Sequence, residues 1–526
     1  MAPLRPEAVS AGGLRVNGAR SLAAAALSGV LLFLSFPKFG HAAVAWLALL
    51  PLLAALVGRR GRGAGRLGYV AGVVSALGLL YWTAIVVAQF GGLSIALATG
   101  AMVLLCLALG LFLAFFGAML GLWLRAFGRS GVLGAPMAWV AMELLRRRVP
   151  YSFPWCLLGY SQSDALPVVQ VAALAGVYGV SFLIVLVPSI AVFAVFEQRA
   201  RRRWLAVAFG LALVACALVY GVARLHVPIA SFGSVRVGLI QASIPQDEKW
   251  QAIYVWRNME RHIALSREAA RDGAKLLIWP ESSVPFYFDS APPIAKTLRQ
   301  LTRETGAYLL FGNDDRADEG EEQVWVGAKL LAPDGQLVLR YHKIQLVPFG
   351  EYVPLESMFG LLGVKKLVEQ AGSYIPGTDA GVGPAGRAQV GVSICYEAIF
   401  PDLARQFTVN GANLLANITN DGWYGRTSAP YQHFAMARLR AVENGRSFVR
   451  AANTGISALV DPRGRLLAKT ELFEQRALVG DVPLTDEATF YARHGDLFAW
   501  TCLIGSGLLS IAAIWRQRRA PAVDWA

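Results

Sequence analysis

Three residues with complementary chemistry each stand at the end of an apolar, strand-like run of the sequence. They are Glu281, Lys343 and Cys395. Active sites of α/β proteins gather at the carboxyl ends of strands. A carboxylate beside a buried strand can act as a general base, an ammonium can stabilise a developing oxyanion, and a thiol can act as a nucleophile. The three types together are candidates for a base, a cation and a nucleophile at one site.

Each residue taken alone also has an ordinary structural interpretation. Glu281 can cap the turn that follows its strand, and Lys343 can be a solvated strand end after the Asp334-Gly335 turn. Cys395 can be a small buried residue, although a strand-to-helix turn would expose its thiol beside free backbone amides. These alternatives stay open at the level of the single residues.

In residues 234–484, short β-rich runs alternate with amphipathic helical patterns, which is typical of a layered α/β domain. The predicted strands cover residues 235–241, 275–279, 308–312, 324–331, 337–341, 390–394 and 414–418. The predicted helices cover residues 251–271, 292–305 and 431–445. This arrangement predicts a buried sheet whose strand ends carry the three polar residues, with hinges at 226–233 and 485–496.

The rest of the chain is strongly apolar. Of 526 residues, 55% are apolar and 16% are charged, against about 25% charged in an ordinary soluble domain. A membrane span needs about 20 apolar residues of helix. Eight such spans are predicted, at residues 21–36, 42–58, 67–89, 93–123, 131–147, 167–196, 204–223 and 496–515. The predicted domains are therefore 1–230 in the membrane, 231–484 outside it, and 485–526 with the last span.

The net charge of +14 lies entirely in the apolar half, because residues 1–230 hold 18 basic and four acidic residues. This placement indicates charges that flank a membrane rather than a nucleic-acid surface. Arginines cluster in alternate loops, which predicts that both termini are cytoplasmic and that 231–484 lies on the opposite side. A cleaved signal peptide at 20–36 is the competing interpretation, but no Ala-x-Ala site follows it. The five cysteines show no CxxC pair, so neither disulfides nor a metal site is expected.

Glu143, Arg146 and Arg147 are charges at the end of a predicted span. Charges at membrane depth are usually paired or functional. They are interpreted either as an interfacial helix end whose arginines reach the lipid headgroups, or as a site that contacts a phospholipid headgroup.

In their order along the chain, Glu281, Lys343 and Cys395 resemble the catalytic residues of the carbon-nitrogen hydrolase (nitrilase) superfamily. The strings Leu346 to Pro354 and Ser393 to Glu397, Phe153-Pro154-Trp155, Asn420 to Tyr424 and the eight spans together resemble its membrane-bound members, the apolipoprotein N-acyltransferases. The resemblance implies an αββα sandwich on a polytopic membrane domain. It also implies Cys395 as nucleophile, Glu281 as proton shuttle and Lys343 as oxyanion partner.

For function, the resemblance implies transfer of the sn-1 acyl chain of a phospholipid, through a Cys395 thioester, to the amine of a diacylated apolipoprotein. It implies a monomeric protein of the bacterial inner membrane that uses no metal or cofactor. Supporting positions are Trp250, Glu351, Tyr396 and Glu397, where hydrogen bonding alone is the alternative role of both glutamates. The apolar segment 358–364, followed by two lysines, is interpreted either as a lid that dips into the membrane interface or as a buried packing helix. An apolar wall formed by Trp250, Tyr396 and residues 286–288 is also expected.

Two other functions fit parts of the sequence. A membrane-tethered amidase would use the same three residues with water as acceptor, although seven preceding spans are more than a tether needs. A transporter with an outer binding module would place polar groups or broken helices in mid-membrane. The spans consist mainly of Ala, Leu, Val and Gly, which disfavours transport.

Overall fold

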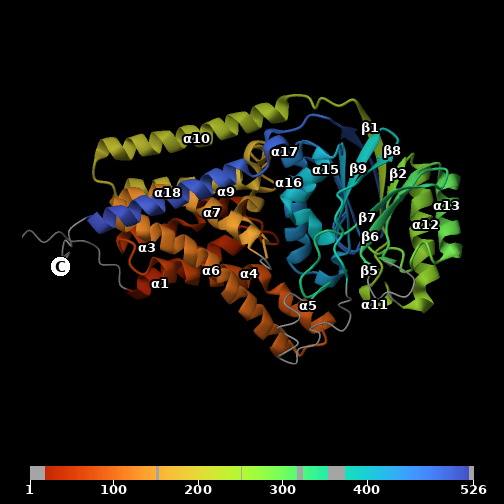
Figure 1. Ribbon diagram of the computed structural model, residues 1–526, viewed down its shortest axis with the longest axis horizontal. Coiled ribbons are helices and arrows are strands. Elements are labelled where there is room, and N and C mark those ends of the chain that lie inside the picture. Colours follow the sequence, from red (N-terminus) through yellow and green to blue (C-terminus); the bar gives the residue numbers. More distant parts are fainter. Residues whose placement is uncertain (1–17, 150–152, 250, 317–323, 353–373, 520–526) are drawn as a thin grey trace, which may run out of the picture.

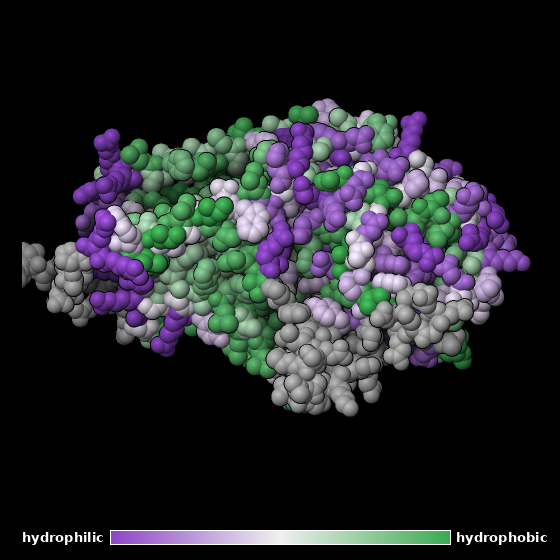
Figure 2. Space-filling view, viewed as in Figure 1, coloured by the Kyte–Doolittle hydropathy of each residue, from purple (hydrophilic) through white to green (hydrophobic). Residues whose placement is uncertain are grey.

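The computed structural model describes residues 18–149, 153–249, 251–316, 324–352 and 374–519, and in it a helical bundle and an α/β domain lie side by side (Figure 1). The bundle carries the apolar surface and the α/β domain the polar one (Figure 2). The helices of the bundle are α1 (Gly18–Leu34), α2 (Ala42–Ala48), α3 (Leu50–Gly58), α4 (Ala64–Leu80), α5 (Trp82–Phe90), α6 (Ile95–Phe127), η1 (Gly128–Gly134), α7 (Ala135–Arg148), η2 (Leu158–Gln162), α8 (Leu166–Val169), α9 (Ala172–Phe196), α10 (Ala200–His226), α17 (Phe490–His494) and α18 (Leu497–Arg519).

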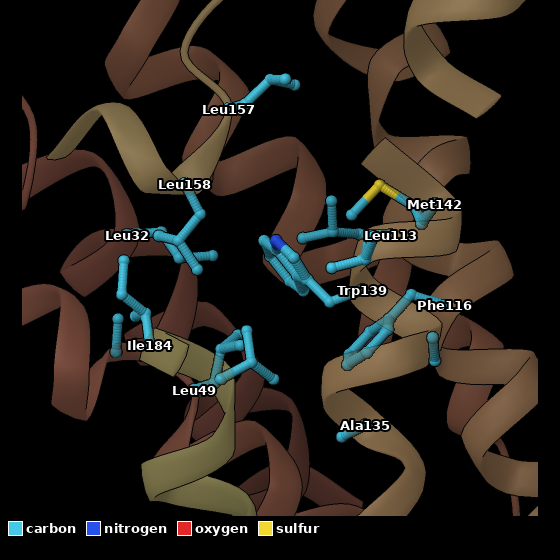
Figure 3. Close-up of a cluster of buried hydrophobic side chains, with 14 of the residues drawn as sticks. Leu32, Leu49, Leu113, Phe116, Ala135, Trp139, Met142, Leu157, Leu158 and Ile184 are labelled. Carbon is cyan, nitrogen blue, oxygen red and sulfur yellow. The ribbon is translucent and has the colours of Figure 1, made fainter. Parts of the chain in front are cut away.

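Small residues let the helices of the bundle approach closely. A Cβ on Gly68 of α4 would lie 2.1 Å from the carbonyl oxygen of Leu113 on α6, and one on Gly117 would lie 2.4 Å from that of Ala64. Packing of this kind drives helix association in lipid, where no hydrophobic effect acts between helices. Deeper in the bundle, Trp139 is surrounded by Leu32, Leu113 and other buried side chains (Figure 3).

Each of the eight predicted spans falls on an apolar helix or helix pair, but not all of these helices are long enough to cross a membrane. Among the described residues, four helical runs are long and apolar enough to cross a membrane: Ile95–Arg148, Ala172–Phe196, Ala200–His226 and Leu497–Arg519. The pair α4 and α5, bent by 50°, makes up to five. The predicted spans 21–36 and 42–58 correspond to shorter apolar helices.

The longest of these runs, Ile95–Arg148, folds back on itself. The rings of Phe116 on α6 and Trp139 on α7 lie 5.2 Å apart. The same two positions would be about 35 Å apart along one continuous helix. The turn lies at η1, where Gly128 has a φ of +61°. Helices α6 and α7 are therefore two antiparallel elements.

Among the described residues, the α/β domain has two six-stranded sheets with helices on their outer faces, and a small two-stranded sheet of β4 and β5. The first sheet has the order β14-β1-β2-β3-β6-β7 and the second β13-β12-β11-β10-β9-β8. Its strands are β1 (Gly233–Gln241), β2 (Leu276–Ile278), β3 (Tyr308–Gly312), β4 (Asp315–Arg316), β5 (Val324–Trp325), β6 (Gly327–Leu331), β7 (Leu337–His342), β8 (Val382–Ala385), β9 (Ala388–Ile394), β10 (Leu414–Thr419), β11 (Ser447–Ala452), β12 (Ala458–Val460), β13 (Leu466–Lys469) and β14 (Arg476–Leu484).

The layers follow the order helix, sheet, sheet, helix, as the αββα expectation requires. Apolar side chains of both sheets form one core between them, to which Leu239 and Val392 belong. The first sheet packs a second core against α12 and α13, and α15 and α16 cover the other sheet (Figure 1). The helices and short helical turns of the domain are α11 (Gln246–Lys249), η3 (Ala252–Tyr254), α12 (Val255–Arg271), α13 (Pro292–Thr305), η4 (Cys395–Ile399), α15 (Pro401–Val409), η5 (Asp421–Tyr424) and α16 (Ala429–Asn444).

The charged end of α7 holds the two parts of the molecule together. Arg147 is paired with Asp402 at the start of α15 and with Asp496 just before α18, and Arg147 and Asp496 are almost fully buried. Arg146 instead donates to the carbonyl oxygens of Phe153 and Trp155, at 3.1 and 2.6 Å. Neither sequence-based interpretation describes Arg147, because its partners are carboxylates of the protein rather than lipid headgroups.

Glu143 has a similar internal role. One carboxylate oxygen accepts hydrogen bonds from the indole of Trp139 at 2.9 Å and from the backbone N–H of Leu158 at 2.7 Å. Glu143 and Arg146 therefore hold the segment 153–158, in which Trp155 contacts α16 of the α/β domain through Gln432.

We expect Arg147→Ala to lower the free energy of unfolding by about 3 kcal/mol or more, because it leaves a buried carboxylate at Asp496 without that partner. Thermal unfolding in detergent measures the change. Arg148→Ala is the matched control, since the Arg148 side chain is 45% exposed and exposed pairs contribute about 1 kcal/mol or less. Equal effects of the two variants would contradict the assignment.

Candidate active site

Because the two sheets pack face to face, the three residues predicted from the sequence lie close together. Glu281 follows β2 and Lys343 follows β7, both in the first sheet, while Cys395 follows β9 in the second. Each side chain thus follows the end of a strand; β2 and β9 lie inside their sheets, and β7 is a partly buried edge strand. The charges of Glu281 and Lys343 both act on the Cys395 thiol, so the three groups form one electrostatic cluster.

Lys343 lies between two carboxylates. Its Nζ is 3.3 Å from Oε1 of Glu281 and 2.5 Å from Oε1 of Glu351. The second oxygen of Glu281 accepts the backbone N–H of Asn420 at 3.0 Å, and that of Glu351 accepts the N–H of Val347 at 2.9 Å. Each carboxylate is therefore held from two sides, which fixes the ammonium between them.

The ordinary interpretation of Lys343 as a solvated strand end is wrong, because the residue is 1% exposed. Burial disfavours its charged form, but the charges of Glu351 and Glu281 outweigh burial and hold the pKa of Lys343 well above its usual value. The side chain is consequently an ammonium throughout the physiological pH range. Because Glu351 lies closest, it supplies much of the negative charge that keeps this cation in the interior.

Cys395 occupies a sharp turn between β9 and η4. Its φ of +51° lies in the left-handed region that few residues other than glycine adopt. The strand-to-turn position matches the prediction, but the predicted exposure does not, because Cys395 is 5% exposed. Burial, then the neighbouring charge of Glu281, raises the pKa of the Cys395 thiol. The resting group is therefore a neutral thiol that needs a base.

A neutral resting thiol has a measurable consequence. The rate at which iodoacetamide alkylates Cys395 should rise about tenfold per pH unit, without a plateau below pH 9, because the thiolate fraction keeps growing below the pKa. The rate is followed by mass spectrometry of the peptide that carries Cys395. Cys395→Ala serves as the control for labelling at the other cysteines, and a plateau near neutral pH would refute the raised pKa.

Glu397 and Tyr396 follow the cysteine directly. The Glu397 carboxylate accepts backbone N–H groups of Ile394 at 2.7 Å and Ile344 at 2.6 Å, together with the Tyr341 hydroxyl at 2.8 Å. It thereby ties the segment after Lys343 to the turn of the cysteine. These bonds favour the hydrogen-bonding role of Glu397 over direct participation in chemistry.

An aromatic junction joins the bundle to the site; we define it as Trp82, Phe153, Trp155, Tyr396 and Tyr424. Phe153 stacks on Trp155 at 5.4 Å and on Tyr396 at 6.0 Å, and Trp82 lies 5.2 Å from Trp155 and 5.1 Å from Tyr424. Trp82 begins α5, just after the bend from α4. The membrane part of the chain thus packs directly beside the turn that carries the cysteine.

Phe288, which was expected in an apolar wall at the site, lies elsewhere. Phe288 packs against Phe311 in the core beneath α13 rather than in the aromatic junction. Trp250 and the expected lid at 358–364 fall outside the residues that the structure describes. Conversely, Asp314, a partly buried group whose charge interacts with that of Glu281, was not predicted from the sequence. Burial and the charge of Glu281 raise the pKa of Asp314 to about 7.

Comparison with known proteins decides the family. Residues 236–490 match the model for carbon-nitrogen hydrolases, and residues 28–190 match that for the N-terminal domain of apolipoprotein N-acyltransferase. An apolipoprotein N-acyltransferase of Geobacter metallireducens is 39% identical over 94% of this chain and 95% of its own. The chain belongs to the apolipoprotein N-acyltransferase family. Relatives of the same name from Nitrosomonas europaea and Chlorobaculum tepidum are 32% and 31% identical over 97% and 94% of the chain.

Membership of the apolipoprotein N-acyltransferase family makes the protein an acyltransferase with membrane-embedded helices, and it disfavours the amidase and transporter alternatives. Among solved structures, an amidase of the nitrilase superfamily from Nesterenkonia covers 52% of this chain at 23% identity, with a TM-score of 0.39. That superposition is too loose to carry residue roles across.

Proposed function

We propose that Cys395 takes the sn-1 acyl chain of a phospholipid as a thioester and passes it to the amino group of a diacylated apolipoprotein. The observation that carries this proposal is the buried cluster in which Lys343 bridges Glu281 and Glu351 beside a neutral thiol. A base, a cation and a thiol at one point are the groups that acyl transfer through a thioester requires.

In the first half-reaction, Glu281 removes the thiol proton as Sγ attacks the ester carbonyl carbon. The carbonyl oxygen becomes an oxyanion, and Lys343 stabilises its charge. The C–O bond to glycerol then breaks, Glu281 returns the proton to the leaving oxygen, and a lysophospholipid departs. Because the site is buried, a fixed ammonium stabilises the oxyanion more strongly than water does.

In the second half-reaction, the free amine of the lipoprotein's diacylglyceryl-cysteine attacks the thioester carbonyl. Lys343 again faces the oxyanion, Glu281 takes a proton from the attacking nitrogen, and the C–S bond breaks. The proton passes to the sulfur, which restores the neutral thiol and releases the triacylated product. The same pair of charged residues serves both steps because both pass through a tetrahedral oxyanion.

Water must be kept from the thioester, since hydrolysis would convert transfer into lipase activity. The aromatic junction supports exclusion of water, because Trp155 is 1% and Tyr396 is 3% exposed. Both side chains pack against the helical bundle. A site beside the bundle allows the acyl chains of both substrates to remain in the lipid. Keeping them there avoids an extraction cost of roughly 0.8 kcal/mol per methylene.

The proposed membrane arrangement has eight spans, with α6 and α7 as separate passes and α4–α5 as one. Both termini lie in the cytoplasm and residues 231–484 in the periplasm. Support comes from the hydrophilic cluster at the end of the bundle remote from the α/β domain (Figure 2) and from arginines at helix ends that border short connections, such as Arg125 in the last turn of α6 and those at 201–203 in the first turn of α10. Short arginine-rich loops stay in the cytoplasm.

In the decisive experiment, the purified protein is incubated with phospholipid and the mass of the intact chain is then measured by mass spectrometry. We expect one fatty acyl adduct, located on Cys395, that disappears when a diacylated lipopeptide is added and reappears on the lipopeptide amine. Free fatty acid released faster than triacylated product would favour hydrolysis instead. Product formation without any adduct on Cys395 would exclude the thioester route.

A further inference from the structure

A row of polar side chains crosses three parallel strands of the second sheet and ends at the nucleophile turn. Ser393, Asn417 and Arg450 are in register on β9, β10 and β11. Arg450 is fully buried, and its guanidinium donates to Oδ1 of Asn417 at 3.0 Å and to Oδ2 of Asp421 at 2.8 Å. A buried cation held on several sides is a rigid base on which neighbouring groups can be oriented.

His433 on α16 continues this row to the cysteine. Its Nε2 lies 3.1 Å from the carbonyl oxygen of Cys395, and its Nδ1 lies 3.1 Å from the Arg450 guanidinium and 3.0 Å from Oδ1 of Asp421. The amide of Asn417 reaches the same carbonyl at 3.4 Å. The carbonyl of the nucleophile is thus approached by two donors, both anchored by Arg450.

The protonation state of His433 follows from these partners. The carbonyl oxygen of Cys395 can only accept, so Nε2 carries a proton and donates to it, while Nδ1 faces both the Arg450 guanidinium, which can only donate, and the Asp421 carboxylate, which can only accept. Burial and the charge of Arg450 lower the pKa of His433, which keeps the ring neutral. The imidazole is therefore a fixed donor aimed at the backbone of Cys395 rather than a base.

We propose that His433 is a positioning residue that holds Cys395 in its left-handed conformation through the carbonyl oxygen and thereby aims the thiol at the acyl donor. Its ring also packs against Trp155 of the aromatic junction, with 5.6 Å between the ring centroids. The residue that contacts the Cys395 carbonyl is therefore also in contact with the helical bundle. The inference rests on the proposed thioester function.

The test compares His433→Gln, which keeps an N–H at the place of Nε2, with His433→Phe, which keeps the ring and loses the donor. The readout is the rate of acyl adduct formation on Cys395 with phosphatidylethanolamine in detergent micelles. His433→Phe should slow it about 100-fold, the effect expected when a reacting atom is misplaced by about 1 Å. His433→Gln should stay within about tenfold, with an unchanged KM for phospholipid and an unchanged pH profile.

His494→Gln is the matched control, because His494 on α17 is exposed and bonds to the carbonyl of its own helix. A His433→Phe variant as fast as wild type, or a His433→Gln variant as slow as His433→Phe, would overturn the proposal. If His433→Phe does not fold, His433→Asn replaces it, since its amide is one methylene too short and should be equally slow.

The two proposals fail separately. If wild type forms no adduct on Cys395, the thioester function fails. If wild type forms the adduct and the variants match it, the role of His433 fails alone. The rate of Cys395 alkylation by iodoacetamide is measured in parallel and should follow the same order of variants, because it reports the orientation of the thiol without acyl transfer.

Discussion

Cys395→Ala is expected to abolish acyl transfer, with a fall of about 10⁴-fold or more in the rate, because removing a nucleophile eliminates the covalent route entirely. The assay follows triacylated lipopeptide formed from phospholipid by the purified variant. Fold and membrane insertion should persist, since the side chain is small and the turn is held by neighbouring groups such as Glu397.

Cys395→Ser gives the matched control for this result. It keeps the size and the hydrogen-bonding capacity of the side chain but replaces the thiol by a poorer nucleophile. We expect it to bind phospholipid as wild type does and to accumulate no thioester. Transfer by Cys395→Ala at even one hundredth of the wild-type rate would show that another group accepts the acyl chain.

Lys343→Met should lower the rate of thioester formation about 1000-fold, since it removes the charged partner of the oxyanion. It should also lower the free energy of unfolding by about 3 kcal/mol or more, because Glu281 and Glu351 would lose the cation between them. Single-turnover kinetics and thermal unfolding measure the two effects independently. A variant within tenfold of the wild-type rate would remove Lys343 from the mechanism.

A double variant separates charge balance from catalysis. Lys343→Met combined with Glu351→Gln removes one charge of each sign, so part of the lost stability should return. The rate should remain low because no ammonium faces the oxyanion. Recovery of the rate together with stability would mean that Lys343 acts only on the fold.

The elements that position the site were predictable where local pattern determines them. Six of the seven predicted strands are confirmed as single strands, because apolar runs bounded by turn residues identify buried strands. The seventh, 324–331, is wrong in part, since it is divided into β5 and β6, which belong to different sheets. The strands β4, β8 and β11–β14 were not predicted. In β11, Ser447 and Arg450 interrupt the apolar run, and their burial depends on partners in other strands and loops, such as Asn417.

In the candidate site, too, the features set by local sequence pattern were predictable and those set by long-range contacts were not. The types and strand-end positions of Glu281, Lys343 and Cys395 were visible in the sequence, but the burial of Lys343 was not, since it depends on Glu281, 62 residues away. His433 gave no signal, because its contact with Cys395 arises from the packing of α16 against the second sheet. Long-range pairing, rather than local pattern, supplies the missing information.

Gln432 has a consequence for how the protein is made. Its side-chain oxygen accepts the indole N–H groups of Trp82 at 3.2 Å and Trp155 at 2.7 Å, and its amide donates to the carbonyl of Leu79. Trp82 leaves the ribosome 350 residues before this partner. The early helices therefore complete their polar contacts late in biogenesis, and nascent chains stalled before α16 should be recognised by membrane quality-control proteases.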